Sequence, residues 1–164
     1  MVVEIKGNLL TDAADMGITH ICHQVNCQGA MNSGIAKSIR EKYPEVYNNY
    51  YSLVRSVKVC NPDPDNFDKF LLGNTQIVFC EDVAVINMFS QSNYGYDGKR
   101  YTSYDAFAEC LENIKEKLHA DKVKIGFPKG IGCCRGGAEW PIIKKMIETI
   151  LDGYIVYIFE LEDN

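Results

Sequence analysis

Two glycine-rich segments hold most of the side chains that could take part in chemistry. The first, His23 to Ala36, contains asparagines at positions 26 and 32; the second, Phe127 to Trp140, contains four glycines and two adjacent cysteines. Each segment follows an apolar run and leads into a helical pattern. Small residues there let the backbone approach a ligand, and a helix start adds N–H groups and a positive dipole end. Two such turns facing each other would hold a diphosphate, which predicts a nucleotide-like ligand.

Strands alternate with helices along the sequence, and this order decides where the two segments lie. Apolar runs predict strands at Val2–Lys6, Thr19–Val25, Thr75–Cys80, Val83–Met88, Val123–Phe127 and Tyr154–Leu161. Helical spacing predicts helices at Gly34–Tyr43, Glu45–Val54 and Trp140–Leu151, and one capped by Thr102 with Asp105 reaching back. The alternation predicts a three-layer α/β/α sandwich around a mixed, largely parallel sheet. Ligands of such sheets bind at the carboxyl ends of the strands, where both glycine-rich segments fall.

Length, charge and cysteine content narrow the class of protein. A chain of 164 residues predicts one domain spanning 1–164, and its net charge of −5 argues against a protein that grips the phosphates of nucleic acid. The seven cysteines are odd in number and scattered, and they match no disulfide framework or zinc spacing, so we expect reduced thiols and no metal site. No signal-peptide pattern or membrane-length apolar run occurs, which predicts a soluble cytoplasmic protein, or one of the host cytoplasm if it is viral.

Four blocks of sequence, taken in order, resemble a known family. They are Lys6-Gly7-Asn8-Leu9, His23 to Ala36, Asn87-Met88-Phe89-Ser90-Gln91 and Pro128 to Trp140. Over nearly its whole length the chain is similar to a macrodomain, the ADP-ribose-binding module. It resembles most the branch that contains ADP-ribose 1″-phosphate phosphatases and the terminal ADP-ribose protein glycohydrolase. The resemblance implies a macrodomain-like fold and a ligand related to ADP-ribose.

The resemblance implies an adenine subsite at the N-terminal end of the chain. Asn8 stands where many macrodomains have an aspartate that accepts from the adenine amino group. An amide oxygen can still accept, but the charge is absent, so selectivity for adenine is expected to be softer. Leu9 would offer its backbone and an apolar wall, and Phe159 would either cover the other face of the base or pack in the core.

The two glycine-rich segments match the family's loops for the diphosphate and the distal ribose. One residue departs from the pattern, because Cys134 stands where the family usually has glycine. A positive φ there would store strain; otherwise the thiol faces the ribose or the core, which is the interpretation we favour. With Asn8, Leu9 and Phe159, the resemblance implies ligand contacts from Asn26, Ala30, Met31, Asn32, Ser33, Gly34, Ile35, Ala36, Gln91, Gly130, Ile131, Gly132, Cys133, Cys134, Arg135 and Gly136.

The chemistry that these residues can support favours hydrolysis of a phosphate monoester. The glycohydrolase of this branch uses a lysine after the fourth strand and an aspartate in the second loop; here the first is absent and the second is Gly136. Phosphate release needs a positioned water and donors for the growing charge. The candidate catalytic residues are Asn32 and Asn26, whose amides can orient water, and His23, which is either a proton-transfer group or a core residue.

Other polar residues near the two loops have a second interpretation. Gln91 could orient water from the facing strand, whereas Lys99 and Lys129 are expected to be solvated. Glu139 is either a base or a carboxylate that serves the helix dipole.

Two functions of different classes remain open at this point. One is an enzyme that removes phosphate, or an acyl or ADP-ribosyl group, from the distal ribose of ADP-ribose. The other is a reader or sequestering protein for ADP-ribose or a related NAD-derived signal. Neither needs a cofactor. The expected partner is ADP-ribose or a derivative, free or attached to an ADP-ribosylated macromolecule, with no role for a membrane or for nucleic acid as such.

Overall fold

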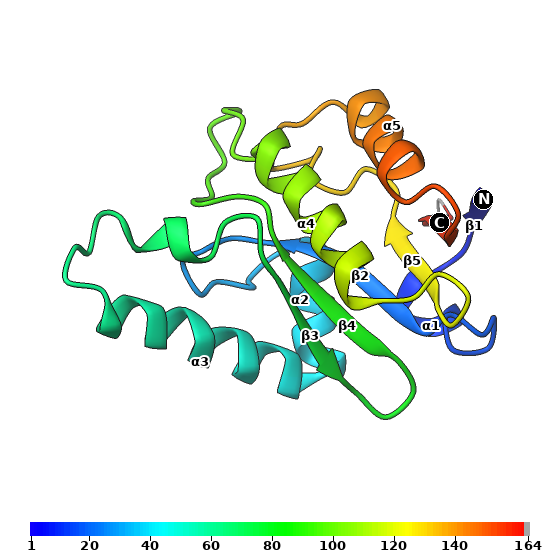
Figure 1. Cartoon of the computed structure of the whole chain (residues 1–164), viewed down its shortest axis with the longest axis horizontal. Helices are drawn as coiled ribbons and strands as arrows, with labels where there is room; N and C mark the ends of the chain where they lie inside the picture. The colour runs from blue at the N-terminus through cyan, green and yellow to red at the C-terminus, as the bar shows by residue number, and fades with distance from the viewer. Residues whose placement is uncertain (163–164) are drawn as a thin grey trace.

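One sheet forms the centre of the molecule (Figure 1). The computed structural model describes residues 1–162, and within them six strands pair in the order β1-β6-β5-β2-β4-β3. Strand β3 is antiparallel to β4, and all other neighbours are parallel. The strands are β1 (Val2–Lys6), β2 (His20–Val25), β3 (Thr75–Phe79), β4 (Ala84–Phe89), β5 (Lys124–Pro128) and β6 (Ile155–Glu160). The expected mixed, largely parallel sheet is confirmed.

Helices cover both faces of this sheet, which confirms the three-layer architecture (Figure 1). The helices are α1 (Leu9–Asp12), α2 (Gly34–Lys42), α3 (Pro44–Cys60), the 3₁₀ helix η1 (Phe67–Phe70), α4 (Tyr104–Lys117) and α5 (Trp140–Ile150). Helices α2 and α3 pack on one face and enclose one buried cluster, while α4 and α5 enclose a second cluster on the opposite face. Of these, α1 and η1 were not predicted; both are single turns too short to show periodicity.

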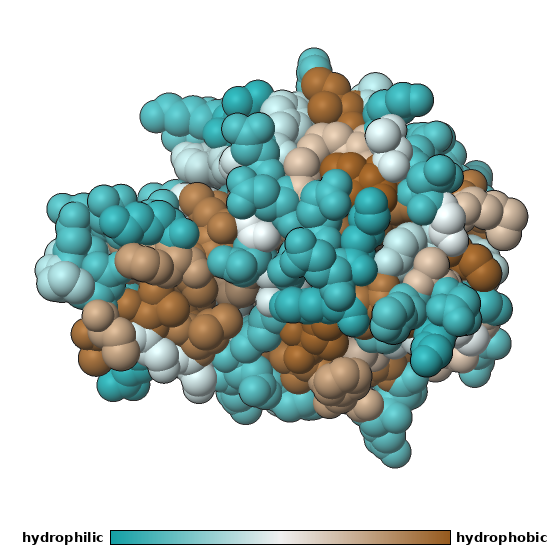
Figure 2. Space-filling view, viewed as in Figure 1, coloured by the Kyte–Doolittle hydropathy of each residue, from teal (hydrophilic) through white to brown (hydrophobic). Residues whose placement is uncertain are grey.

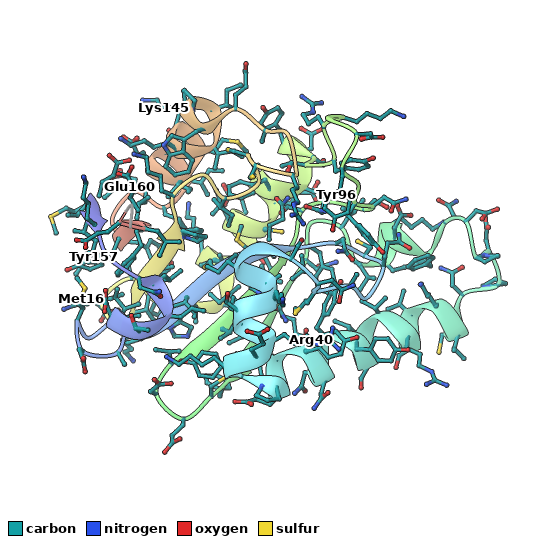
Figure 3. All side chains as sticks on the ribbon, turned by 180° about the vertical axis from the view of Figure 1, so that it is seen from behind. Met16, Arg40, Tyr96, Lys145, Tyr157 and Glu160 are labelled. Carbon is teal, nitrogen blue, oxygen red and sulfur yellow. The ribbon has the colours of Figure 1, made fainter. Side chains whose placement is uncertain are left out.

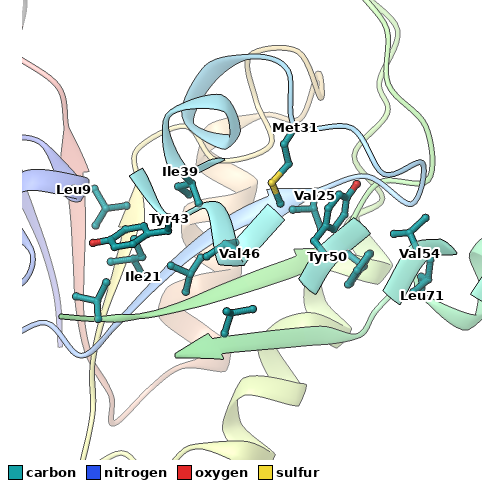
Figure 4. Close-up of a cluster of buried hydrophobic side chains, with 14 of the residues drawn as sticks. Leu9, Ile21, Val25, Met31, Ile39, Tyr43, Val46, Tyr50, Val54 and Leu71 are labelled. Carbon is teal, nitrogen blue, oxygen red and sulfur yellow. The ribbon is translucent and has the colours of Figure 1, made fainter. Parts of the chain in front are cut away.

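Strand β2 runs through the middle of the sheet and is buried on both faces. Ile21 and Val25 belong to the cluster under α2 and α3 (Figure 4), whereas Cys22 belongs to the cluster under α4 and α5. Side chains alternate across a strand, so an apolar residue at successive positions is what a parallel strand covered by helices requires. The position of β2 places the first glycine-rich segment at the centre of the sheet edge.

Helices α2 and α3 meet at a sharp break. Tyr43 has φ −126° and ψ 77°, and Pro44 follows as the first residue of α3, which confirms the predicted end of the first helix. Helix α3 continues to Cys60, so its predicted end at Val54 was wrong. The extra turns are retained because Val57 packs against the buried cluster.

The predicted cap of α4 was also wrong. Ser103, not Thr102, is the N-cap, and its hydroxyl accepts from the backbone N–H of Ala106 at 3.1 Å. The Thr102 hydroxyl instead donates to the carbonyl oxygen of Gly132 at 2.8 Å. Because its hydroxyl makes this long-range hydrogen bond, Thr102 does not cap the helix. The same bond connects the start of α4 to the second glycine-rich segment.

The surface seen in Figure 2 alternates between hydrophilic areas and smaller hydrophobic ones. The most exposed large apolar side chains among residues 1–162 include Val59, Phe70 and Phe79, at 76%, 56% and 79% exposure. None of the described helices combines the length and the apolar character needed to cross a membrane.

Candidate functional site

A large cavity lies along the carboxyl edge of the sheet. Its volume is about 1010 Å³, at the upper end of the range of small-molecule sites, and both glycine-rich segments line it. All the ligand contacts predicted from the sequence line this cavity; of the predicted site residues, only His23 does not. Residues that line the cavity but were not predicted include Thr11, Gln24, Ser38, Lys42, Tyr94, Tyr96 and Glu160.

Asn8 stands at the end of the cavity formed by β1 and β6. Its Oδ1 caps α1 by accepting from the backbone N–H groups of Leu10 at 2.9 Å and Thr11 at 3.3 Å. The oxygen is therefore used by the protein, and the side-chain NH₂ is the part left for a ligand. Phe159, only 3% exposed, lies at this end too and belongs to the buried cluster, so it is a core residue that also forms part of the cavity wall.

The first loop is held in shape by Asn26. Its Oδ1 accepts from the backbone N–H of Gln28 at 2.9 Å, and its Nδ2 donates to the carbonyl oxygen of Ala30 at 2.9 Å. The hydroxyl of Tyr50, from α3, lies 2.7 Å from the carbonyl oxygen of Asn26 and 2.8 Å from its Oδ1. The amide that we expected to orient water is thus engaged in the loop. The structure assigns Asn26 to holding the loop, and the buried Tyr50 supports it from the core.

Asn32 and Gly34 present the first loop to the cavity. Oδ1 of Asn32 accepts from Arg40 Nη1 at 3.1 Å, and the Arg40 guanidinium lies 3.6 Å from the centre of the Tyr47 ring. This stack fixes the orientation of the Asn32 amide, whose Nδ2 side is left for a ligand. Gly34 has φ +58°, and a Cβ at this position would meet no atom within 4 Å. The start of α2 is therefore open to the cavity and needs glycine for its backbone conformation.

The second loop is shaped by glycines and by one close contact. Gly130 and Gly132 have φ of +77° and +76°. A Cβ on Gly136 would lie 2.2 Å from Oγ1 of Thr102 and 2.4 Å from the carbonyl oxygen of Gly132. The aspartate of the glycohydrolase pattern has no space at this position, so the difference at Gly136 is part of the packing of the loop.

The two cysteines of this loop are unstrained. No residue other than glycine has a positive φ among residues 1–162, so Cys134 adopts an ordinary backbone conformation, as we favoured, and its side chain is exposed at the cavity. Burial raises the pKa of the neighbouring Cys133 thiol, and Cys134 adds to that rise. A raised pKa makes the thiolate scarce, which argues against a nucleophilic role for Cys133.

A polar network joins the two loops to the strand ends. Nε2 of Gln24 donates to Oε1 of Gln91 at 2.5 Å and to the Thr102 hydroxyl at 2.9 Å, while Oε1 of Gln24 accepts from the Ser90 hydroxyl at 2.7 Å. Through Thr102 the network reaches the carbonyl of Gly132. The network fixes the second loop relative to β2 and β4. It engages the Oε1 of Gln91, the residue that could have oriented water from the facing strand.

His23 is a core residue. Its side chain is fully buried on β2, and Nε2 lies 2.5 Å from Oδ1 of Asn87 on the neighbouring strand β4. Burial lowers the pKa of His23 to about 4, although the Asn87 hydrogen bond acts in the opposite direction. Of the two interpretations open from the sequence, the structure supports the core one, because His23 lies outside the cavity and stays neutral near pH 7.

We expect His23 to make stability depend on pH. Its pKa is about 4 when folded and 6.5 in the reference state, so the unfolded chain binds the additional proton between these values. The free energy of unfolding should therefore have its highest value above pH 6.5 and fall by up to about 3 kcal/mol on acidification to pH 4. His23→Ala should lower stability at pH 7 by roughly 2–4 kcal/mol and flatten this dependence. Urea unfolding between pH 4 and 8 measures both, with exposed His119→Ala as control; an unchanged slope in His23→Ala would contradict the assignment.

Three other charged residues near the loops are not free to act on a ligand, because each lies outside the cavity or already forms an ion pair. Lys99 does not line the cavity and lies 3.8 Å from Asp97. Lys129 does line it, but pairs with Glu160 at 3.1 Å. Glu139 is the exposed N-cap residue of α5 and lies outside the cavity, so the helix-dipole interpretation is the one that the geometry favours. Within residues 1–162, no three His, Cys, Asp or Glu side chains come together as a candidate metal site.

Comparison with known proteins identifies relatives of this fold and sequence. No family model matches the chain. It is 27% identical to an ADP-ribose 1″-phosphate phosphatase from Aspergillus oryzae, over 90% of this chain and 88% of that protein. Among solved structures, the macrodomain of Mycobacterium tuberculosis DarG matches with a TM-score of 0.75 and 18% identity, covering 97% of each chain. Thermosipho africanus DarTG in complex with ADP-ribose matches with a TM-score of 0.71 and 17% identity, over 98% of this chain and 41% of that one.

Proposed function

Starting from the premise that this chain has the macrodomain fold, we propose that it binds ADP-ribose in the large cavity and releases phosphate from ADP-ribose 1″-phosphate. The observation that carries the proposal is that both glycine-rich loops line one cavity at the carboxyl edge of the sheet. Backbone N–H groups there can bind a diphosphate despite the net charge of −5. The named activity of the Aspergillus oryzae relative supports the same choice of substrate.

The proposed reaction is attack of water on the terminal phosphorus. The bond from phosphorus to the C1″ oxygen breaks, the ribose keeps that oxygen as a hydroxyl, and the products are ADP-ribose and inorganic phosphate. Such transfers pass through a loose transition state, so they depend more on positioning and on donors to the phosphate oxygens than on a strong base. In this account Nδ2 of Asn32 orients the water or a phosphate oxygen, and the loop N–H groups hold the diphosphate.

A reader function is the second candidate, and two observations favour it. His23 is buried away from the cavity, and Glu160, the only carboxylate lining it within residues 1–162, is paired with Lys129. A lysine–aspartate glycohydrolase is disfavoured because no lysine follows β4 directly and Gly136 has no space for a side chain.

Incubation of the purified protein with ADP-ribose 1″-phosphate decides between enzyme and reader. We expect release of phosphate, unaffected by EDTA, together with saturable binding of ADP-ribose measured in parallel. A variant that blocks the first loop, Gly34→Glu, serves as control for contaminating phosphatases. Binding of ADP-ribose without phosphate release would reject the phosphatase and leave the reader.

Asn8→Asp should sharpen selectivity for adenine. An aspartate keeps one oxygen for the cap of α1 and supplies a second acceptor where Asn8 now offers NH₂. Adenine carries an amino donor that hypoxanthine lacks, so the ratio of affinities for ADP-ribose over the inosine analogue should rise roughly tenfold. Calorimetric titration of both ligands measures the ratio. A ratio that stays the same in Asn8→Asp would place the base elsewhere.

A further inference from the structure

The cavity has two chemically different ends. One end lies at β1 and β6, where Asn8 and Phe159 stand, and the other lies beyond β4, where the connection to α4 contributes Tyr94 and Tyr96. Four strand spacings separate β1 from β4, so the ends of these two strands lie roughly 19 Å apart. In Figure 3 the labels of Glu160, toward the left, and Tyr96, near the middle, stand apart from each other. If adenine occupies the first end, the group carried by the distal ribose points toward the second.

Arg135 brings a positive charge to this second end. It comes from the second glycine-rich loop, lines the cavity, and its guanidinium carbon lies 4.4 Å from the centre of the Tyr96 ring. No carboxylate of residues 1–162 lies within ion-pair distance of Arg135. The other cationic side chains of the cavity wall are engaged, since Lys42 donates to the carbonyl oxygen of Leu10 and Lys129 pairs with Glu160.

The contact with Tyr96 leaves the guanidinium prepared for an anion. A ring that covers one face of the group restricts its movement while the N–H donors at its edge stay available. Those donors match two oxygens of a phosphate, and a charge-assisted pair of this kind is about twice as strong as a neutral hydrogen bond. A sugar hydroxyl at the same place would gain much less, because it carries no charge.

From this geometry we infer that Arg135, held against Tyr96, is the subsite for the terminal phosphate and makes the cavity select ADP-ribose 1″-phosphate over ADP-ribose. The inference rests on the proposed function for the identity of the ligand. It adds the residue that distinguishes substrate from product. Tyr96 is the positioning residue, and its ring rather than its hydroxyl carries the role.

Substitutions at the pair test the inference, with calorimetry for both ligands and steady-state phosphate release. Arg135→Gln should weaken binding of ADP-ribose 1″-phosphate, or its kcat/KM, by about tenfold or more, and change the affinity for ADP-ribose less than twofold. Tyr96→Ala should have the same effect more weakly, and Tyr96→Phe should restore it. Arg100→Gln is the matched control, because Arg100 also lies over a tyrosine ring, at 4.7 Å from that of Tyr104, but outside the cavity.

The outcomes separate this inference from the proposed function. Equal losses for both ligands in Arg135→Gln, or no loss for either, would overturn the phosphate subsite even if the wild type is an active phosphatase. A wild type that releases no phosphate would reject the enzyme. Calorimetry with the intact ADP-ribose 1″-phosphate would then still test the phosphate subsite at Arg135. A loss of affinity in Arg135→Gln for the phosphorylated ligand alone would support the subsite, and any other result would overturn it.

Discussion

Gly34→Glu is expected to remove ligand-induced stabilisation of the protein almost completely. A side chain at this position extends into open space at the start of α2, beside the loop proposed to hold the diphosphate. A carboxylate there clashes with the ligand and repels its charge, so affinity for ADP-ribose should fall by about 100-fold or more, equivalent to roughly 3 kcal/mol. Thermal melts with and without ADP-ribose measure the loss. With ADP-ribose at a concentration one hundred times its Kd, the free energy of unfolding of the wild type should rise by about 2.7 kcal/mol.

Gly34→Ala is the matched control for this variant. Because φ is +58°, any side chain at position 34 costs about 1 kcal/mol of backbone strain, or roughly 2–4 °C in Tm, in both variants. Only the glutamate should also abolish the ligand-induced shift. If Gly34→Glu retains that shift, the first loop does not hold the ligand.

Asn32→Ala is expected to lower turnover far more than affinity. The Arg40 contact holds Oδ1, so the amide presents Nδ2 to the cavity in one orientation. A donor that acts on the attacking water or on the growing phosphate charge contributes mainly in the transition state, so kcat should fall roughly 100-fold while the Kd for ADP-ribose changes little. Steady-state phosphate release and calorimetry on the same preparations measure the two effects.

Asn48→Ala controls for the loss of a surface amide, because Asn48 is exposed on α3 and does not line the cavity. Arg40→Gln should reproduce part of the kcat effect, since it frees the Asn32 amide to rotate. A parallel loss of affinity and turnover in Asn32→Ala would mean that Asn32 stabilises the bound ligand and the transition state equally and has no specific part in catalysis.

The sequence was sufficient for the architecture because hydrophobic periodicity is a local property. All six strands of the described sheet were predicted within about two residues of their ends, and Pro44 marked the break between α2 and α3. The errors came where distant contacts decide the local structure. Threonine is a common N-cap residue, but the Thr102 hydroxyl donates to the carbonyl oxygen of Gly132, 30 residues away. Ser103 therefore caps the helix instead.

In the site, too, local features could be predicted from the sequence and long-range contacts could not. The loops could be predicted because glycines and helix starts are visible in the sequence, and every ligand contact assigned to them lines the cavity. The state of each side chain could not be predicted. His23 is paired with Asn87, which is 64 residues away, and the Asn26 amide is engaged by its own loop and by Tyr50. Tyr96 reaches Arg135 only through the folded arrangement of two loops.

The central proposal for this protein is that ADP-ribose occupies the cavity, with both loops around its diphosphate and distal ribose. Calorimetric titration of the wild-type protein with ADP-ribose and with AMP tests this, because AMP has the adenosine but neither the diphosphate nor the distal ribose. We predict saturable binding of ADP-ribose that is at least about tenfold tighter than that of AMP. Equal affinity for the two ligands, or no heat with ADP-ribose, would contradict the assignment of this cavity.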